Sequence, residues 1–263
     1  MPFYVFYCAY VVKKKVSNVF KSFFHSSKTA LADFSKVQVD FHSHFIPGID
    51  DGAKTMADST AMIRRMSELG FKKLITTPHI QGEFFKNTPE IILGGLEKLR
   101  EAVAAENIQV ELEAAAEYLL DDAFEEKMIS GSLLSFSNKH ILVEMSYYSP
   151  NPDLKNLIFN LQVDGFKVIL AHPERYTYWF NDFAKYEDLK DRGVFFQLNT
   201  VSLAGHYPEP VKKFAVKLVE KGMIDFIGSD MHNMNYMKSL ENSLKEKLLA
   251  KLVNSGRLMN AGL

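Results

Sequence analysis

The sequence predicts one α/β domain built from repeated strand–helix units, in a barrel-like (β/α) fold with about seven strands. From residue 37 onward, short runs of β-branched and aromatic residues alternate with longer helical patterns, which is typical of a parallel sheet. The polar residues at or just after the ends of successive runs, at 42, 79, 117, 144, 172, 199 and 230, lie 27 to 38 positions apart, close to the ~30 residues of one βαβ crossover. No Pro/Gly/Ser-rich linker interrupts the alternation, so we expect a single folded unit over 37–263.

The expected strands follow one another along the chain, and helical patterns separate them. In order, they cover 37–42, 71–77, 108–117, 139–144, 166–172, 194–199 and 223–230. A glycine directly precedes four of them, at Gly70, Gly165, Gly193 and Gly222. Such a glycine takes the left-handed conformation that ends a helix, so it supports the boundary between each helix and the next strand.

The composition excludes several classes of protein. The chain has 31 Lys+Arg against 32 Asp+Glu, and this balance argues against nucleic-acid binding through bulk charge. Hydrophobic residues make up 47% of the chain, which is enough for a packed core. Cys8 is the only cysteine, so an intramolecular disulfide is excluded, and any metal site has to use histidines and carboxylates.

Residues 1–36 are a basic and aromatic extension ahead of the predicted domain. The apolar run 1–12 is shorter than the ~20 residues that cross a bilayer, and its lysines follow it, whereas those of a secretory signal come first. We therefore expect a cytoplasmic protein. Residues 1–32 contain five lysines and no acidic residue, which suits weak contact with an anionic membrane surface; the alternatives are a start codon placed too early or a loose helix packed on the domain.

Histidines and carboxylates stand at or just after the ends of the expected strands, where a core would need apolar residues. In (β/α) barrels the carboxyl ends of the strands converge on one face and carry the active site. Carboxylates gathered there would repel one another, so two or three divalent cations are the simplest way to neutralise them. The candidate ligands are His42, His44, Asp51, His79, Glu117, Glu144, His172, Asp230 and His232.

Local spacing agrees with a metal site. The two residues of each pair His42/His44 and Asp230/His232 are two positions apart, so they share one side of an extended segment and can reach one ion. Imidazole and carboxylate donors suit Mn, Fe or Zn without choosing among them. Taken alone, a histidine such as His79 or His172 is equally well explained by a hydrogen bond at a strand end. His25, His140 and His206 lie outside the pattern and are interpreted as surface or core residues.

Six segments together resemble a known family. In order over 37–235 they read DFHSHFIPGIDDGAKT, ITTPH, AAEYLL, ILVEMS, ILAHPERY and IGSDMHN. They resemble the PHP (polymerase and histidinol phosphatase) superfamily and, more narrowly, the manganese-dependent bacterial protein-tyrosine phosphatases of capsule and exopolysaccharide operons. The resemblance implies a distorted TIM-like (β/α)7 barrel, the PHP fold, with three metal ions at the carboxyl ends of its strands. It favours Mn²⁺, with Fe or Zn as alternatives.

The same resemblance divides the candidate ligands among three ions. It implies one group of His42, His44, Glu117 and Asp230, a second of Glu117, Glu144 and His172, and a third of Asp51, His79 and His232. Asp50 competes with Asp51 for the third group. Asp51 is preferred because the family pattern places the ligand immediately before the glycine.

The implied activity is hydrolysis of phosphotyrosine on a protein, by metal-activated water and without a phosphoenzyme. The implied substrate is a bacterial tyrosine autokinase that regulates capsular or exopolysaccharide synthesis. Arg175 matches the family arginine that grips the phosphate, a role suited to its planar fork of donors; a surface salt bridge is the alternative. Cys8 lies outside any C-x5-R loop, which excludes the thiolate mechanism of other tyrosine phosphatases.

The sequence departs from the family pattern at one position that concerns phosphate binding. Relatives often carry a second arginine soon after the D-x-H-N, but here only Lys238 is nearby, and it offers a point charge without bidentate geometry. Several tyrosines near the expected mouth could stack on a phosphotyrosine ring or simply pack there: Tyr147, Tyr148, Tyr176 and Tyr178.

Three alternative functions use the same residues differently. The first is a small-molecule phosphomonoesterase acting on histidinol phosphate or a sugar phosphate. The second is a non-catalytic metal-binding PHP module, which the complete set of donors disfavours. The third is a mononuclear amidohydrolase, which the lack of a strand-end lysine ligand disfavours.

Overall fold

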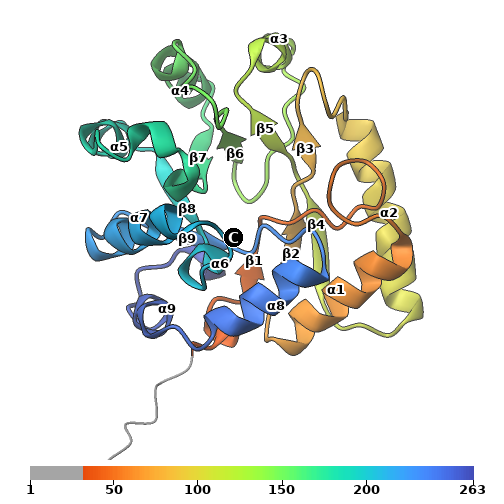
Figure 1. The fold of residues 1–263 in the computed structure, drawn as a ribbon. Helices are drawn as coiled ribbons and strands as arrows, with labels where there is room; N and C mark the ends of the chain where they lie inside the picture. Colours follow the sequence, from red (N-terminus) through yellow and green to blue (C-terminus); the bar gives the residue numbers. More distant parts are fainter. Residues whose placement is uncertain (1–31) are drawn as a thin grey trace, which may run out of the picture.

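A computed structural model of the chain describes residues 32–263, with strands gathered in the middle and helices around them (Figure 1). The strands are β1 (Val39–Asp40), β2 (Lys73–Thr76), β3 (His79–Ile80), β4 (Glu111–Ala114), β5 (Glu117–Leu119), β6 (His140–Glu144), β7 (Lys167–Ala171), β8 (Phe195–Asn199) and β9 (Phe226–Gly228). The α-helices are α1 (Met56–Glu68), α2 (Pro89–Ala105), α3 (Asp122–Ser130), α4 (Leu154–Val163), α5 (Ala184–Asp191), α6 (Thr200–Leu203), α7 (Glu209–Glu220), α8 (Met234–Ser243) and α9 (Lys247–Val253). Short 3-10 helices are η1 (Phe34–Lys36), η2 (Pro173–Arg175), η3 (Thr177–Trp179) and η4 (Asn260–Gly262).

The strands form two sheets in which every pairing is parallel. One has the order β1-β2-β4 and the other the order β3-β5-β6-β7-β8-β9. Neighbouring strands are joined through helices on the outside, for example α4 between β6 and β7. This arrangement confirms the predicted α/β class with parallel strands.

The prediction of about seven continuous strands was wrong at two of them. The run 71–77 contains β2, which ends at Thr76, and a separate strand, β3, begins at His79. Pro78 lies between them and interrupts the pairing, because proline has no N–H to donate to a sheet. The neighbouring run 108–117 breaks in the same place and becomes β4 and the start of β5. Its backbone follows the bend: the Ala115 N–H donates to Thr76 O, and the Glu117 N–H donates to Pro78 O.

No closed sheet is found within residues 32–263, so the structure confirms the parallel α/β class and does not confirm the predicted barrel. Between the β1 and β9 segments there is one isolated parallel bridge, from Ser43 to Met231. Nearer the start of the same two segments, the Asp40 carboxylate accepts hydrogen bonds from the Ser229 N–H (2.7 Å) and hydroxyl (2.9 Å). Two backbone hydrogen bonds accompany the bridge, from the Asp230 N–H to His42 O (2.8 Å) and from the His44 N–H to Met231 O (2.9 Å), so the two segments lie side by side without forming a longer ladder.

Two apolar clusters hold the domain together. The larger lies between the sheets and the surrounding helices. The smaller lies among the strands, where Phe41 stacks on Phe136 at 5.3 Å and meets Phe226 edge-on at 5.2 Å. Members of this small cluster come shortly before site residues in the sequence, as Phe226 of β9 does before Asp230. Polar side chains at the carboxyl ends therefore rest on a packed apolar layer.

The conformations of four glycines confirm the predicted boundaries between helices and strands. Gly70, Gly165, Gly193 and Gly222 all have positive φ, between 71° and 106°, and each precedes a strand as predicted. A helix start also fixes a site loop, since Thr55 and Asp58 form a capping box at α1 directly after the D-D-G segment.

The proposed extension lies almost entirely outside the described residues, and so does its suggested membrane contact. The described part includes Phe34, which is buried and stacks on Phe71 at 5.0 Å. A domain boundary after residue 36 stays a prediction. Over residues 32–263 the structure contains no helix with the length and apolar character needed to cross a membrane.

Candidate metal centre

Four buried side chains meet where β1 and β9 end and where β5 begins. The Nε2 atom of His42 lies 3.1 Å from Glu117 Oε2 and 3.3 Å from Asp230 Oδ1. The Nε2 atom of His44 lies 3.5 Å and 3.4 Å from the same two oxygens. We call these four residues, His42, His44, Glu117 and Asp230, the inner group.

The inner group fits a divalent cation. Three of its buried atoms make no hydrogen bond: His42 Nε2, His44 Nε2 and Glu117 Oε2. Buried polar atoms nearly always have a partner, and leaving one without costs about 1–3 kcal/mol. A cation among these lone pairs would satisfy all three at once, and two imidazoles with two carboxylates are a donor set that transition metals accept.

A second group shares Glu117 with the first. His79 Nδ1 lies 3.2 Å from Glu117 Oε2 and 3.1 Å from Glu144 Oε1. His172 approaches the opposite oxygens of the same carboxylates, with Nε2 3.0 Å from Glu117 Oε1 and 3.9 Å from Glu144 Oε2. Glu117 therefore stands where a carboxylate could bridge two ions.

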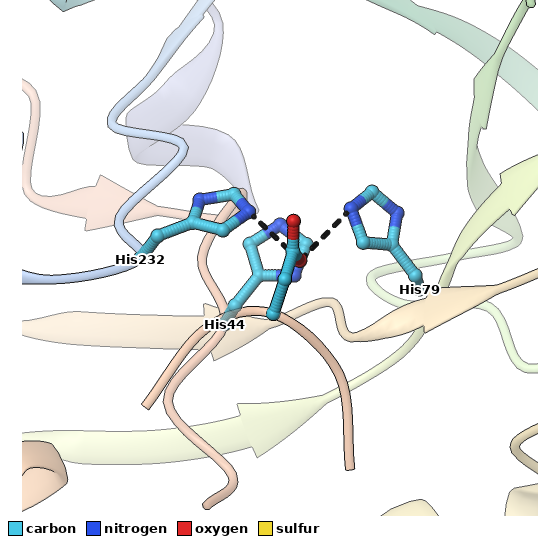
Figure 2. Close-up of side chains that lie close together, drawn as sticks. His44, His79 and His232 are labelled. Carbon is cyan, nitrogen blue, oxygen red and sulfur yellow. Dashed lines mark ion pairs between the residues drawn. The ribbon is translucent and has the colours of Figure 1, made fainter. Parts of the chain in front are cut away.

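A third group lies nearer to solvent. Asp51 Oδ1 is 3.3 Å from His232 Nε2 and 3.6 Å from His79 Nε2. Figure 2 shows the rings of His44, His79 and His232 pointing toward one another, and His44 belongs to this group as well as to the inner one. The Asp51 side chain is 58% exposed, whereas those of the inner group are buried. We call His44, Asp51, His79 and His232 the outer group.

The structure brings all nine predicted ligands into one cluster, and their roles as ligands stay predictions. Asp50, the competitor for Asp51, takes a different place: its Oδ2 lies 2.7 Å from His44 Nδ1 and accepts a hydrogen bond from the His79 N–H. His140 and His206 lie away from the cluster, contacting Ser137 O and Ser239 Oγ respectively. His25 is outside the described residues.

Charges within the cluster oppose the effect of burial. Burial lowers the pKa of His79, but the Glu117 and Glu144 carboxylates outweigh it and raise that pKa to about 9. Burial raises the pKa of Asp50, but the His44 imidazole outweighs it and lowers the pKa to about 2. Glu117 and Asp230 keep pKa values well below the usual range for the same reason, with His42 the leading opposing charge. The cluster therefore pairs anionic carboxylates with imidazoles.

Two candidate ligands have a strained backbone. His172 has φ 33° and Asp230 has φ 52°, the left-handed region that residues other than glycine avoid. Such conformations cost about 1–3 kcal/mol each and gather at functional sites, where the surrounding structure imposes them. His172 directly follows β7, and Asp230 lies two residues after the end of β9. At both positions this backbone conformation turns the side chain into the cluster.

A family model for proteins described as "Capsular polysaccharide synthesis, CpsB/CapC" matches residues 38–254. The chain belongs to this family. It is 30% identical over 197 residues to the tyrosine-protein phosphatase YwqE of Bacillus subtilis, covering 74% of this chain and 78% of YwqE. It is 25% identical over 225 residues to the tyrosine-protein phosphatase CpsB of Streptococcus pneumoniae, covering 81% of this chain and 92% of CpsB.

A solved structure extends the comparison. It belongs to a crystallographic description of YwqE and CpsB as "unique metal-dependent tyrosine phosphatases", and it aligns with a TM-score of 0.74 at 28% identity. The alignment covers 82% of this chain and 89% of the solved one. The resemblance stated from the sequence motifs is thereby confirmed at the level of the CpsB/CapC family.

In this CpsB/CapC chain, Arg175 lies beside the inner group. Its Nη1 donates to Asp230 Oδ2 at 3.2 Å, and its guanidinium lies between the rings of Tyr147 (4.4 Å) and Tyr207 (4.6 Å). Two cation–π contacts and one ion pair therefore hold the side chain next to the candidate metal positions. At 21% exposure it can still be reached from solvent.

The tyrosines named from the sequence divide into two kinds. Tyr176 is fully buried and donates to Ala171 O, and Tyr178 donates to Ser146 O, so both serve packing. Tyr147 contacts His172 Nε2 through its hydroxyl, at 3.3 Å, and Tyr148 is 96% exposed. Lys238 is exposed on α8, and within residues 32–263 no hydrogen bond or ion pair joins it to the cluster.

Sequence reasoning missed several residues that touch the candidate ligands. Gln197 and Asn199 of β8 contact His42 and Asp230, Gln81 donates to Glu144 at 2.9 Å, and Tyr207 donates to Asp230 at 3.2 Å. The sequence of β8 could have indicated that Gln197 has a role, because an amide inside an otherwise apolar strand needs a hydrogen-bond partner. Nothing in the sequence indicated which partners these are.

Proposed function

We propose that this CpsB/CapC chain is a metal-dependent protein-tyrosine phosphatase that hydrolyses phosphotyrosine. The observation that carries the proposal is the inner group, where buried nitrogen and oxygen atoms converge without hydrogen-bond partners. The names of YwqE and CpsB support the same activity. The finer proposal is a cluster of three Mn²⁺ ions at the strand ends.

The proposed ligands follow the three groups of the structure. The inner group would hold one ion, and Glu117 would extend to a second ion together with Glu144 and either His172 or His79. Asp51 and His232, with His79, would hold the third. His79 offers Nδ1 to one group and Nε2 to another, so its assignment is the point at which this partition differs from the one the motifs imply.

Bound divalent cations supply a nucleophilic water near neutral pH and neutralise charge on the attacking and leaving oxygens. The residues of the chain supply binding and orientation. Arg175 presents a planar fork of donors to the phosphoryl oxygens, held in place by the rings of Tyr147 and Tyr207. Because the tyrosine phenol has a pKa of ~10, its phenolate leaves without strong help from a general acid.

The first experiment tests metal dependence and substrate class together. The purified full chain is stripped with a chelator, Mn²⁺ is returned, and phosphate release is measured on a phosphotyrosine peptide, histidinol phosphate and a sugar phosphate. The proposal expects activity only with metal and a preference for the peptide. A higher kcat/KM on either small molecule would instead support the phosphomonoesterase, and no turnover of any substrate with Mn²⁺ would support the non-catalytic module.

The physiological substrate in this proposal is a bacterial tyrosine autokinase of capsule or exopolysaccharide synthesis, met in the cytoplasm. The family description, which names capsular polysaccharide synthesis, supports it. Incubation of the chain with a phosphorylated autokinase is the test, followed by a phosphotyrosine immunoblot. Retention of the phosphotyrosine signal, at enzyme levels that clear a peptide, would remove the autokinase from the proposal.

A further inference from the structure

Strand β8 contributes no candidate ligand, yet two of its amides lie directly behind the inner group. Gln197 Oε1 is 2.7 Å from His42 Nδ1, and Gln197 Nε2 donates to Asn199 Oδ1 at 3.0 Å. Asn199 Nδ2 then donates to Asp230 Oδ2 at 2.7 Å. Gln197 and Asn199 are both fully buried, so these contacts replace water completely. The four side chains form one continuous chain of hydrogen bonds, which we call the β8 relay.

Chemistry fixes the direction of the relay from one end. A carboxylate that binds a metal is ionised and can only accept, so Asn199 must turn its NH₂ toward Asp230. The Asn199 oxygen is then left to accept from the Gln197 NH₂, which in turn leaves the Gln197 oxygen toward His42. An amide oxygen can only accept, so His42 must carry its proton on Nδ1. In the neutral imidazole that binds a metal, the lone pair is then on Nε2, which faces Glu117 and Asp230.

The backbone leaves room for this arrangement at one glycine of β9. A Cβ added to Gly228 would lie 2.7 Å from Gln197 Nε2 and 2.8 Å from His42 Cβ, distances that real Cβ atoms do not show. The φ of Gly228 is not positive, so clearance, and not backbone conformation, requires glycine here. The relay is thus accommodated by a third strand as well as by β8.

We propose that Gln197 and Asn199 are positioning residues for the metal centre. They hold His42 in the Nδ1-protonated form and turn Asp230 so that Oδ1 faces the inner group while Oδ2 is engaged behind it. The other inner histidine has a different support, since His44 Nδ1 lies against the Asp50 carboxylate. The inference rests on the proposed metal binding but not on phosphatase activity.

The experiment measures Mn²⁺ binding by the metal-stripped full chain, from the free-ion signal in electron paramagnetic resonance. Gln197→Met and Asn199→Leu keep the approximate size of each side chain and remove its hydrogen bonds. Loss of such supporting partners costs about 10- to 100-fold in metal affinity, and each variant should show a Kd raised within that range. Because the relay acts as a unit, the double variant should cost little more than the worse single one.

Two further variants keep the test independent of folding. Gly228→Ala leaves both amides in place and should also weaken Mn²⁺ binding, because its methyl group displaces Gln197 from His42. Gln162→Met is the matched control: the Gln162 amide bonds the Arg192 carbonyl on the surface, so its loss should leave the Kd unchanged. Melting temperatures of the metal-free proteins separate a loss of stability from a loss of metal affinity.

The outcomes separate this inference from the proposed function. A parent chain that binds Mn²⁺ while Gln197→Met, Asn199→Leu and Gly228→Ala bind it within twofold of the parent would overturn the β8 relay alone. The same holds if the effects of the two single variants simply add in the double variant. A parent chain that binds no Mn²⁺ would overturn the proposed metal-dependent function itself.

Discussion

Two layers of buried carboxylates lie at the strand ends, and the same burial has opposite outcomes in them. Glu117 and Asp230 face the cluster, and although burial raises their pKa values, the nearby imidazoles hold these values well below the usual range. Asp40 and Glu174 lie behind the cluster, and burial raises the pKa of each to about 7. All four are at most 1% exposed, so the neighbouring imidazoles, not the depth of burial, decide the charge.

The hydrogen bonds of the rear layer explain its role. Asp40 accepts from the backbone and hydroxyl of Ser229, next to Asp230. Glu174 accepts from the Asn199 N–H and the Ser202 hydroxyl, at 3.0 and 2.7 Å. The front layer therefore offers anionic oxygens to the candidate metal positions, while the rear layer bonds the backbone beside Asp230 and the backbone of Asn199, whose side chain contacts Asp230. The predictions below test this division.

The largest expected effect comes from removing a residue of the front layer. Asp230→Ala or His42→Ala should lower Mn²⁺-dependent hydrolysis of a phosphotyrosine peptide by more than about 100-fold, beyond what loss of a supporting partner costs. Circular dichroism should show a fold that is largely intact. Hydrolysis at the parent rate by either purified variant would show that the assigned roles are wrong.

The next largest effect on kcat/KM is expected from Arg175, the candidate phosphate-binding residue. Arg175→Ala removes charge-assisted hydrogen bonds worth about 1.5–3 kcal/mol, so kcat/KM should fall about 10- to 100-fold. Arg175→Lys keeps the charge without the planar fork and should fall between Ala and the parent. Steady-state kinetics on the peptide measure both. An unchanged kcat/KM in Arg175→Ala would place the side chain outside the site.

A smaller effect is expected at the outer group. Asp51 is more than half exposed, so water can replace part of what its carboxylate provides. Asp51→Asn should weaken the binding of the most loosely held Mn²⁺ by about 10-fold, at the lower end of the range for supporting contacts. Metal titration of the stripped chain measures this. Asp50→Asn is the informative companion, because it changes the support of His44 and leaves Asp51 in place.

The sequence was sufficient to predict the front layer but not the rear one. Candidate ligands such as Glu144 and His172 stand out because each ends an apolar run, and the run itself marks a strand. Glu174 has no such mark: its partners Asn199 and Ser202 come 25 and 28 residues later in the chain. The β8 relay was missed for the same reason, since Gln197 and His42 are 155 residues apart.

The sequence likewise predicted one part of the fold and not another. Alternation and helix-ending glycines predicted the order of strands and helices, and Pro78 offered a local reason for the break between β2 and β3 that the prediction did not use. The absence of a closed sheet within the described residues could not be predicted locally. It depends on how the segments around β1 and β9 meet, and the contacts there, such as that between Asp40 and Ser229, join residues 189 positions apart.

The smallest expected effect on catalysis comes from Glu174, whose charge matters for stability. In the folded protein its pKa is about 7, above the usual ~4.3 of an unfolded chain, so the folded state binds more protons between these values. The free energy of unfolding should therefore fall as pH rises from 4.5 to 7, by up to about 3 kcal/mol from this group. Denaturant titrations of Glu174→Gln should lose that part of the pH slope, while its kcat/KM stays near the parent value. A slope that persists in the variant would contradict the raised pKa.

Anomalous diffraction from crystals grown with Mn²⁺ tests the central claim most directly. We expect peaks within coordination distance of His42 Nε2, His44 Nε2, Glu117 Oε2 and Asp230 Oδ1, with further peaks near Glu144 and Asp51. Difference density without any such peak, with these side chains turned away from one another at saturating Mn²⁺, would contradict the account.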